Sequence, residues 1–331
     1  MKVGLIGRGS ISYAHMAAYD RMKAEQKDVE IVACCDIRPE QMDDMGDVRK
    51  YTNIDTFLEA EKGNLDYVDI CLPTYLHTEV SIKAMKKGYN VLCEKPMTLT
   101  FEDAKQMCDV AKETQRLLMI AQCSRFLGAF REMYKVCQSG ELGKVRHAEF
   151  YREGGSLEPM GYQNWFRNES LSGGAILDLH VHDADLIRAA FGMPKAVSTI
   201  AANHIPGAGY DALTTHYIYD DMFVCANCDW TTAHNKINSR SFRMNFEKGY
   251  MFVDRSPERT IFLKMDINGN AEDLTDKIDA GMYYNEITYY MDCLNSGKPV
   301  SLCPPEETAE SVKIALAEKK SADLQGEKVY L

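Results

Sequence analysis

The chain has 331 residues, of which 45% are hydrophobic and 26% are charged. This composition is typical of a folded globular protein, and the length allows two domains. The formal net charge of −11 argues against a nucleic-acid or anionic-membrane surface, because both need concentrated Lys and Arg. We therefore expect small-molecule partners, with neither nucleic acid nor membrane among them.

The N-terminus and the cysteines bear on the cellular location. Strand-like sequence starts at Lys2, with no basic segment followed by an apolar one, so we expect a cytoplasmic protein. The eleven cysteines lie mostly in apolar runs, which predicts buried, reduced thiols. Cys225 and Cys228 have the spacing of a metal or redox site, but their surroundings look like a strand, where positions three apart face opposite sides. We predict no metal site.

The first elements are a strand at 2–6, a glycine turn and a helix at 13–23. Glycines in such a turn let backbone N–H groups approach a pyrophosphate, which then lies at the N-terminus of the helix. Ser12 stands where the full fingerprint has a third glycine, so the match is incomplete. The residues of this turn that we expect to contact a dinucleotide are Gly7, Gly9, Ser10 and Ile11.

The second predicted strand, 29–35, ends at Asp36. Its spacing from the glycine turn is that of the acidic residue that binds the adenosine ribose. A carboxylate there accepts hydrogen bonds from the ribose hydroxyls and repels a 2′-phosphate, which favours NAD over NADP. Arg38 weakens this argument, because a guanidinium two residues on could bind a 2′-phosphate. We expect both side chains to contact the cofactor.

Strands and helices continue to alternate up to residue 122. The predicted helices are 55–61, 79–87 and 102–114, and the predicted strands are 67–72, 89–93 and 117–121. Strands separated by crossover helices form a parallel sheet. We therefore assign residues 1–122 to a Rossmann dinucleotide-binding domain.

Residues 123–331 have a different pattern and form the predicted second α/β domain. Successive β-rich stretches joined by short turns indicate a mainly antiparallel sheet. The predicted strands are 145–152, 196–203, 212–219, 222–231, 241–247, 250–254 and 260–263, with helices at 127–139, 283–295 and 306–324.

The motif Glu94-Lys95-Pro96 follows directly on the strand 89–93. Ligands of open α/β sheets bind outside the carboxyl ends of the strands, so Lys95 would face the ligand. Pro96 disfavours a helical conformation of Lys95 and keeps its backbone extended. Taken alone, the same residues could form an ordinary charged loop.

A second group of polar residues lies between Ser172 and Asp185. Helical sequence through this stretch would place Asp178 and His182 four residues apart on one face, while His180 would point elsewhere. A carboxylate beside an imidazole can orient it as a general base. The alternative is a helix N-terminal carboxylate beside a surface histidine.

Together these motifs resemble the Gfo/Idh/MocA family of glucose–fructose oxidoreductases and inositol dehydrogenases, over nearly the whole chain. The resemblance rests on Gly7 to Ser12, Asp36, Pro73-Thr74 with His77, Glu94-Lys95-Pro96, Asn164-Trp165-Phe166-Arg167, and Gly173-Gly174 with Asp178 and His182. It implies a Rossmann domain followed by an α/β domain with a large open sheet, which often associates into a dimer or tetramer. It also implies hydride transfer between a nicotinamide and a carbon of a sugar or polyol.

The resemblance implies that Lys95, Asp178 and His182 form the catalytic set. His182 would accept the hydroxyl proton as hydride leaves the carbon, and Lys95 would stabilise the charge that develops on the oxygen. Asp178 would bind a neighbouring hydroxyl. Further expected cofactor contacts are Pro73, Thr74, His77, Glu94, Lys95 and Trp165, and the expected substrate contacts are Lys95, Arg125, Tyr151, Asp178, His182 and Tyr283.

Several alternatives remain open from the sequence. The aromatic residues among these could serve core packing instead. Relatives with this fold include glycosidases that use a tightly held NAD, and dinucleotide-binding regulators without turnover. The regulators tend to lose the catalytic residues, which this chain keeps. His180 replaces a residue that is small in many members, so the wall of the active site differs there.

Overall fold

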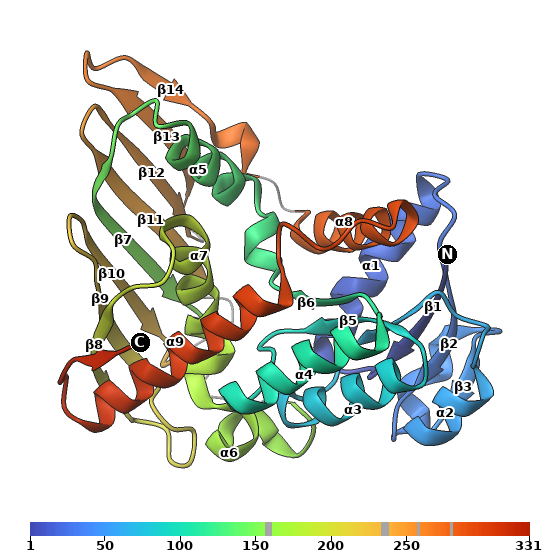
Figure 1. The fold of residues 1–331 in the computed structure, drawn as a ribbon. Helices are drawn as coiled ribbons and strands as arrows, with labels where there is room; N and C mark the ends of the chain where they lie inside the picture. The colour runs from blue at the N-terminus through green and yellow to red at the C-terminus, as the bar shows by residue number, and fades with distance from the viewer. Residues whose placement is uncertain (156–160, 233–237, 257–258, 279–280) are drawn as a thin grey trace. The chain divides into compact units, whose positions relative to one another are not determined.

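The structure is a computed structural model that describes residues 1–155, 161–232, 238–256, 259–278 and 281–331 (Figure 1). The chain divides into two compact units, each made of two segments. Unit 1 contains residues 1–123 and 281–309, and unit 2 contains residues 124–280 and 310–331. The first change of unit lies between residues 123 and 124, and residues 281–309 return to unit 1.

The described residues of unit 1 form one sheet of six parallel strands in the order β3-β2-β1-β4-β5-β6. The strands are β1 (Lys2–Ile6), β2 (Glu30–Cys35), β3 (Arg49–Tyr51), β4 (Tyr67–Ile70), β5 (Asn90–Glu94) and β6 (Leu118–Ala121). This confirms the predicted Rossmann sheet. The strand order reverses between β1 and β4, where open α/β sheets bind their ligands. The short, polar β3 has no apolar pattern and was not predicted.

Helices cover both faces of this sheet. They are α1 (Ser10–Ala24), α2 (Ile54–Ala60), α3 (Thr74–Lys86), α4 (Phe101–Thr114) and α8 (Met282–Ser296). Figure 1 shows α1 and α8 on one face and α3 and α4 on the other. Because both faces are covered, the central strands are continuous apolar runs. The sequence placed the start of α3 five residues too late, since the helix begins immediately after Pro73.

The described residues of unit 2 form one sheet of nine strands in the order β14-β13-β12-β11-β7-β10-β9-β8-β15. The strands are β7 (Val145–Glu153), β8 (Ala196–Ala202), β9 (Ala212–Ile218), β10 (Phe223–Asp229), β11 (Ser239–Phe246), β12 (Gly249–Arg255), β13 (Thr260–Asp266), β14 (Ala271–Asp273) and β15 (Val329–Tyr330). The sheet is mainly antiparallel, as predicted. The pairing of β7 with β10 is parallel, which is possible because a long connection with helices separates them.

One face of this sheet is buried and the other carries exposed apolar side chains. The helices of unit 2 are α5 (Gly128–Ser139), α6 (Glu169–Ser172), α7 (Val181–Phe191) and most of α9 (Pro305–Asp323). Residues of α5 and α7 share a hydrophobic core with β7, β10, β11 and β12. Elsewhere on the sheet, Ile200 is 62% exposed, and the 51% exposed Phe223 contacts the rings of His147 and His216.

All eleven cysteines lie among the described residues, and all are free thiols. Ten are buried and Cys137 is half-buried, as the apolar runs around them predicted. Burial raises the pKa of Cys34 and Cys35 to about 12, so these thiols stay protonated at neutral pH. Among the described helices, none combines the length and apolarity needed to cross a membrane.

Candidate functional site

The glycine turn joins β1 to α1 in unit 1. Gly7 has φ +97° and its N–H donates to the Cys35 carbonyl at 2.8 Å. A Cβ at Gly7 would lie 2.5 Å from the Cys71 carbonyl oxygen, so only glycine fits there. A Cβ at Gly9 would meet nothing within 4 Å, which leaves open space at the N-terminus of α1. This is the space that a pyrophosphate occupies in a dinucleotide-binding turn.

Ser12 and Arg8 hold this turn in place. The Ser12 hydroxyl donates to the Gly9 carbonyl at 2.7 Å, which explains why serine can replace the third glycine here. The Arg8 guanidinium is fully buried and donates to both carboxyl oxygens of Asp44, at 2.8 and 2.9 Å. This role was not predicted, because an arginine between two glycines resembles an exposed loop residue.

Asp36 follows β2 and is 7% exposed. Its Oδ2 accepts the Arg8 N–H at 2.7 Å, and its Oδ1 accepts the Arg38 N–H at 2.8 Å. The Arg38 side chain also donates to Oδ1, at 3.3 Å. Each carboxylate oxygen can accept more than one hydrogen bond, so Asp36 retains capacity for ribose hydroxyls. Arg38 lies against this carboxylate, and this arrangement favours NAD over NADP.

His77 connects the loops that follow β4 and β5. One ring nitrogen lies 2.8 Å from the Pro96 carbonyl oxygen and the other lies 2.8 Å from the Leu72 carbonyl oxygen. Burial lowers the pKa of His77, although the hydrogen bonds to the two carbonyls act in the opposite direction. Pro73 and Thr74 form the start of α3 in the same region. His77 therefore fixes the distance between the two loops.

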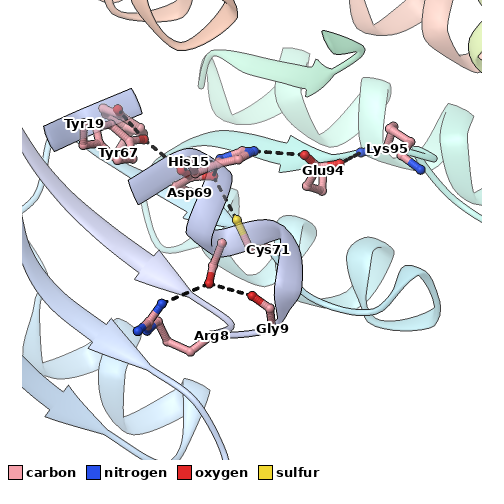
Figure 2. A network of polar contacts seen from close by, with 10 residues as sticks. Arg8, Gly9, His15, Tyr19, Tyr67, Asp69, Cys71, Glu94 and Lys95 are labelled. Atoms are coloured by element: carbon pink, nitrogen blue, oxygen red, sulfur yellow. Dashed lines mark hydrogen bonds and ion pairs between the residues drawn. The ribbon is translucent and has the colours of Figure 1, made fainter. Parts of the chain in front are cut away.

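The Glu94-Lys95-Pro96 motif ends β5, and the Lys95–Pro96 peptide bond is cis. Glu94 is 3% exposed, and its Oε2 accepts the Lys95 backbone N–H at 2.9 Å. Its Oε1 lies 2.9 Å from Nε2 of His15, on α1 (Figure 2). The cofactor contacts predicted for unit 1 thus follow the carboxyl ends of β1, β2, β4 and β5, which share one edge of the sheet.

A buried network behind this edge was not predicted. His15 lies between Asp69, on β4, and Glu94, and all three are at most 3% exposed. The Tyr19 hydroxyl donates to Asp69 at 2.8 Å. Glu286, on α8, is also fully buried. The available signal was the carboxylate of Asp69 inside an otherwise apolar strand, because a buried charge needs partners.

Two groups in this network have the spacing of metal ligands among the described residues. They are His15 with Asp69 and Cys71, and His15 with Glu94 and Glu286. Both groups depend on His15, whose two ring nitrogens already face carboxylate oxygens at 2.9 Å. The side chains of these two groups therefore fit ion pairs and hydrogen bonds with one another, inside unit 1.

In unit 2, Asp178 and His182 lie on successive turns of one helical segment. Asp178 belongs to a π-helical turn, Ile176–His180, which continues into α7, where His182 lies. The segment is therefore helical, as predicted, although not a regular α-helix at Asp178. Turns of this kind occur frequently at functional sites. His182 is 7% exposed, and its Nδ1 lies 3.2 Å from the Ser124 hydroxyl.

His180 lies in the same turn and is fully buried. Its Nε2 lies 3.1 Å from the Tyr217 hydroxyl and 3.4 Å from a Glu318 oxygen. Burial acts to lower the pKa of His180, but the charge of Glu318 and the hydrogen bonds to Glu318 and Cys228 together outweigh burial, so the pKa is raised. His180 is therefore part of the interior of unit 2.

The other predicted substrate contacts have different surroundings. Arg125 forms a buried two-point ion pair with Asp185, at 2.7 and 2.8 Å. Tyr151 lies on β7 and is 36% exposed. Tyr283 lies in unit 1, where its ring centroid is 5.7 Å from that of His15. Trp165 stacks on Phe166 with the ring centroids 4.0 Å apart.

A parallel sheet with a glycine turn after its first strand and an acidic residue after its second defines a dinucleotide-binding protein. Residues 1–122 match the model described as an oxidoreductase family with an NAD-binding Rossmann fold, and residues 130–252 match the Gfo/Idh/MocA C-terminal domain. The chain therefore belongs to the Gfo/Idh/MocA oxidoreductase family, and unit 1 contains its NAD-binding domain. This confirms the family expected from the sequence motifs.

Curated relatives include three enzymes that act on sugars or a polyol. The chain is 28% identical over 216 residues to D-glucoside 3-dehydrogenase of Escherichia coli, covering 63% of this chain and 59% of that protein. It is 29% identical over 229 residues to levoglucosan dehydrogenase of Pseudarthrobacter phenanthrenivorans, covering 65% and 58%. It is 27% identical over 192 residues to myo-inositol 2-dehydrogenase of Thermotoga maritima, covering 57% and 54%. The matches thus span little more than half the length of each relative.

The solved structures show that the fold extends over the whole chain. Levoglucosan dehydrogenase in complex with NADH and levoglucosan is similar with a TM-score of 0.87 at 20% identity, covering 100% of this chain and 99% of that chain. An oxidoreductase from Agrobacterium radiobacter in complex with NAD+, L-tartaric acid and magnesium has a TM-score of 0.85 at 19% identity, covering 100% and 98%.

Proposed function

We propose that this protein is an NAD-dependent dehydrogenase that transfers hydride between the nicotinamide and a secondary alcohol carbon of a sugar, sugar derivative or cyclic polyol. The observation that carries the proposal is the position of Lys95 at the end of β5, on the same sheet edge as the glycine turn and Asp36. An amine there can hydrogen-bond the reacting oxygen of a substrate bound next to the cofactor. The three named relatives support the substrate class.

The residues of unit 1 fit NAD. The open space at Gly9 and the N-terminus of α1 would receive the pyrophosphate, with Ser10 and Ile11 next to it. Asp36 would accept the adenosine ribose hydroxyls. Pro73 and Thr74 follow β4 on the same edge. When bound, the nicotinamide supplies the acceptor for the hydride.

Three side chains would carry the chemistry on the protein's side. Lys95 would donate to the substrate oxygen and stabilise the negative charge that develops on it. His182 would take the proton of the hydroxyl group while a hydride, which carries two electrons, leaves the carbon of that hydroxyl for the nicotinamide. Asp178 would accept a hydrogen bond from a neighbouring hydroxyl and orient the ring. Tyr151, Arg125, Trp165 and Tyr283 are further proposed contacts.

The test is turnover with NAD and a panel of inositols, pyranoses and glucosides, followed by the absorbance of reduced nicotinamide. Lys95→Ala should abolish turnover by removing the group that stabilises the oxygen, and it should retain NAD binding measured by calorimetry. Turnover in this variant equal to wild type would refute the mechanism.

Two alternatives give different results in the same assays. A glycosidase that uses NAD transiently would release the aglycone from a glycoside without net reduced nicotinamide, which product analysis detects. A dinucleotide-binding regulator would bind NAD and turn over no member of the panel. The presence of Lys95, Asp178 and His182 together supports the dehydrogenase.

We further infer a homo-oligomer, a dimer or tetramer, in a reducing cytoplasm. The exposed Ile200 and Phe223 on the sheet of unit 2 are apolar surface of the kind that association buries. The buried free thiols fit a reducing compartment. Sedimentation equilibrium tests the assembly, and Phe223→Lys should shift it toward monomer.

A further inference from the structure

A line of buried hydrogen bonds leads from β4 through α1 to Lys95 (Figure 2). Asp69 accepts the Tyr19 hydroxyl and lies 2.9 Å from Nδ1 of His15. Nε2 of His15 lies 2.9 Å from Oε1 of Glu94. The other oxygen of Glu94 accepts the Lys95 N–H at 2.9 Å. The strand β4, the helix α1 and the end of β5 are therefore linked by hydrogen bonds to the backbone N–H of Lys95.

The geometry fits a proton on each ring nitrogen of His15, because each nitrogen faces a carboxylate oxygen at 2.9 Å. A neutral imidazole has one N–H, so it could donate to Asp69 or to Glu94 but not to both. Burial alone would lower the pKa of His15, yet the charge of Asp69, its hydrogen bond to the ring and the neighbouring Cys71 together outweigh burial, and the pKa is raised well above its usual value. His15 is thus an imidazolium between two carboxylates.

The remaining groups around His15 do not compete with this arrangement. Tyr283 contributes an aromatic ring, and Cys71 a buried thiol whose pKa is raised to about 12. The pKa of Glu286 is raised by burial and by the charge of Glu94, which keeps this carboxyl protonated. Among the residues that the structure describes around this carboxylate, His15 is the charged partner of Glu94, at 2.9 Å.

We propose that His15, held by Asp69, is a positioning residue for Lys95. It fixes the side chain of Glu94, and Glu94 in turn fixes the peptide plane before Lys95 and the direction in which the lysine side chain leaves β5. This inference rests on the proposed function, because the position of Lys95 affects the rate only if its amine contacts the reacting oxygen. Small displacements of such a group are costly, since about 1 Å of misplacement reduces a rate by roughly 100-fold.

Two variants separate this role from a merely structural one. In His15→Gln, the side-chain amide can still donate to Glu94 but no longer reaches Asp69. The double variant His15→Met with Asp69→Asn removes both contacts of the ring, while the new amide oxygen still accepts the Tyr19 hydroxyl. The control is Glu61→Gln, a fully buried carboxylate of unit 1 that accepts hydrogen bonds from Arg49 and Tyr51 instead.

The readouts are kcat, the KM for NAD, thermal stability and the acetylation rate of the Lys95 amine, measured by mass spectrometry against exposed lysines. We expect the double variant to lose about tenfold to 100-fold in kcat with an unchanged KM for NAD, and His15→Gln to recover most of that loss. The Lys95 acetylation rate should change in the double variant. Glu61→Gln should lower stability without changing kcat or the acetylation rate.

The proposal is overturned if the double variant lowers kcat no more than Glu61→Gln does at an equal loss of stability. An unchanged Lys95 acetylation rate in the double variant overturns it as well. If the wild type turns over no substrate, the proposed function fails, and the acetylation rates still decide whether His15 positions Lys95.

Discussion

Replacing Glu286 with glutamine should stabilise unit 1 at neutral pH and have little effect in acid. Neither carboxyl oxygen of this buried residue has a hydrogen-bond partner among the described residues. Burial, followed by the charge of Glu94, raises its pKa well above the usual value of 4.5. The folded protein therefore holds a proton on Glu286 at pH values where the unfolded chain has released it.

The sign and size follow from proton linkage. A carboxyl whose pKa is raised by folding contributes stability that is complete below its unfolded pKa and is lost as the pH rises toward its folded pKa. In that window the unfolding free energy falls by about 1.4 kcal/mol per pH unit. Glutamine does not titrate, so the variant should gain roughly 3 kcal/mol on wild type between pH 5 and pH 7 while Glu286 stays protonated in the fold.

The assay must report on unit 1. Both tryptophans, Trp165 and Trp230, lie in unit 2, so fluorescence would follow the other unit. Hydrogen exchange of peptides from β4 and β5 at pH 5, 6 and 7, corrected for the intrinsic rates, measures the opening free energy of the correct unit. A stability difference that is independent of pH, or a variant less stable than wild type at pH 7, would refute the reasoning.

Glu61→Gln is the matched control for this experiment. A hydrogen bond from Arg49 lowers the pKa of Glu61, so this carboxylate contributes stability above its unfolded pKa and loses it as the pH falls. The same substitution should therefore destabilise unit 1 at neutral pH.

Four further predictions concern the predicted site. Gly7→Ala should destabilise unit 1 by about 2 kcal/mol or more, because its positive φ and the backbone carbonyl 2.5 Å from the added Cβ both oppose a side chain, and hydrogen exchange measures it. Gly9→Ala should leave stability within about 1 kcal/mol but weaken NAD binding in calorimetry, and equal effects of the two would contradict this. Asp36→Asn should lower the preference for NAD over NADP, measured as the ratio of Kd values, by removing the charge that repels a 2′-phosphate. Arg125→Met should cost about 3–5 kcal/mol by leaving Asp185 buried and unpaired, as seen in thermal unfolding; unchanged stability would show that the ion pair is dispensable.

The features that could be predicted from the sequence are those that short-range patterns of residues determine. The parallel sheet of unit 1 followed from the alternation of apolar runs and helices, and the glycine turn and Asp36 were found from their spacing. The short β3 and the early start of α3 were missed because neither has an apolar period of its own. The parallel pairing of β7 with β10 depends on which distant strands meet, which no local pattern specifies.

The buried network was missed for a related reason. His15, Asp69 and Glu286 come from three distant segments, and each looks ordinary in its own helix or strand. Their relation exists only after α1, β4 and α8 are packed together. A carboxylate within the apolar strand β4 was the single local sign that a partner had to be present.

The return of residues 281–309 to unit 1 has a consequence for synthesis of the protein. A ribosome releases the first 123 residues long before α8, so α1 and the sheet wait without the helix that covers them. During that interval their apolar and ionic surface is exposed to other chains. Unit 2 also lacks its last segment until residues 310–331 have been synthesised. Both units therefore complete their folding only after residues 281–331 have emerged.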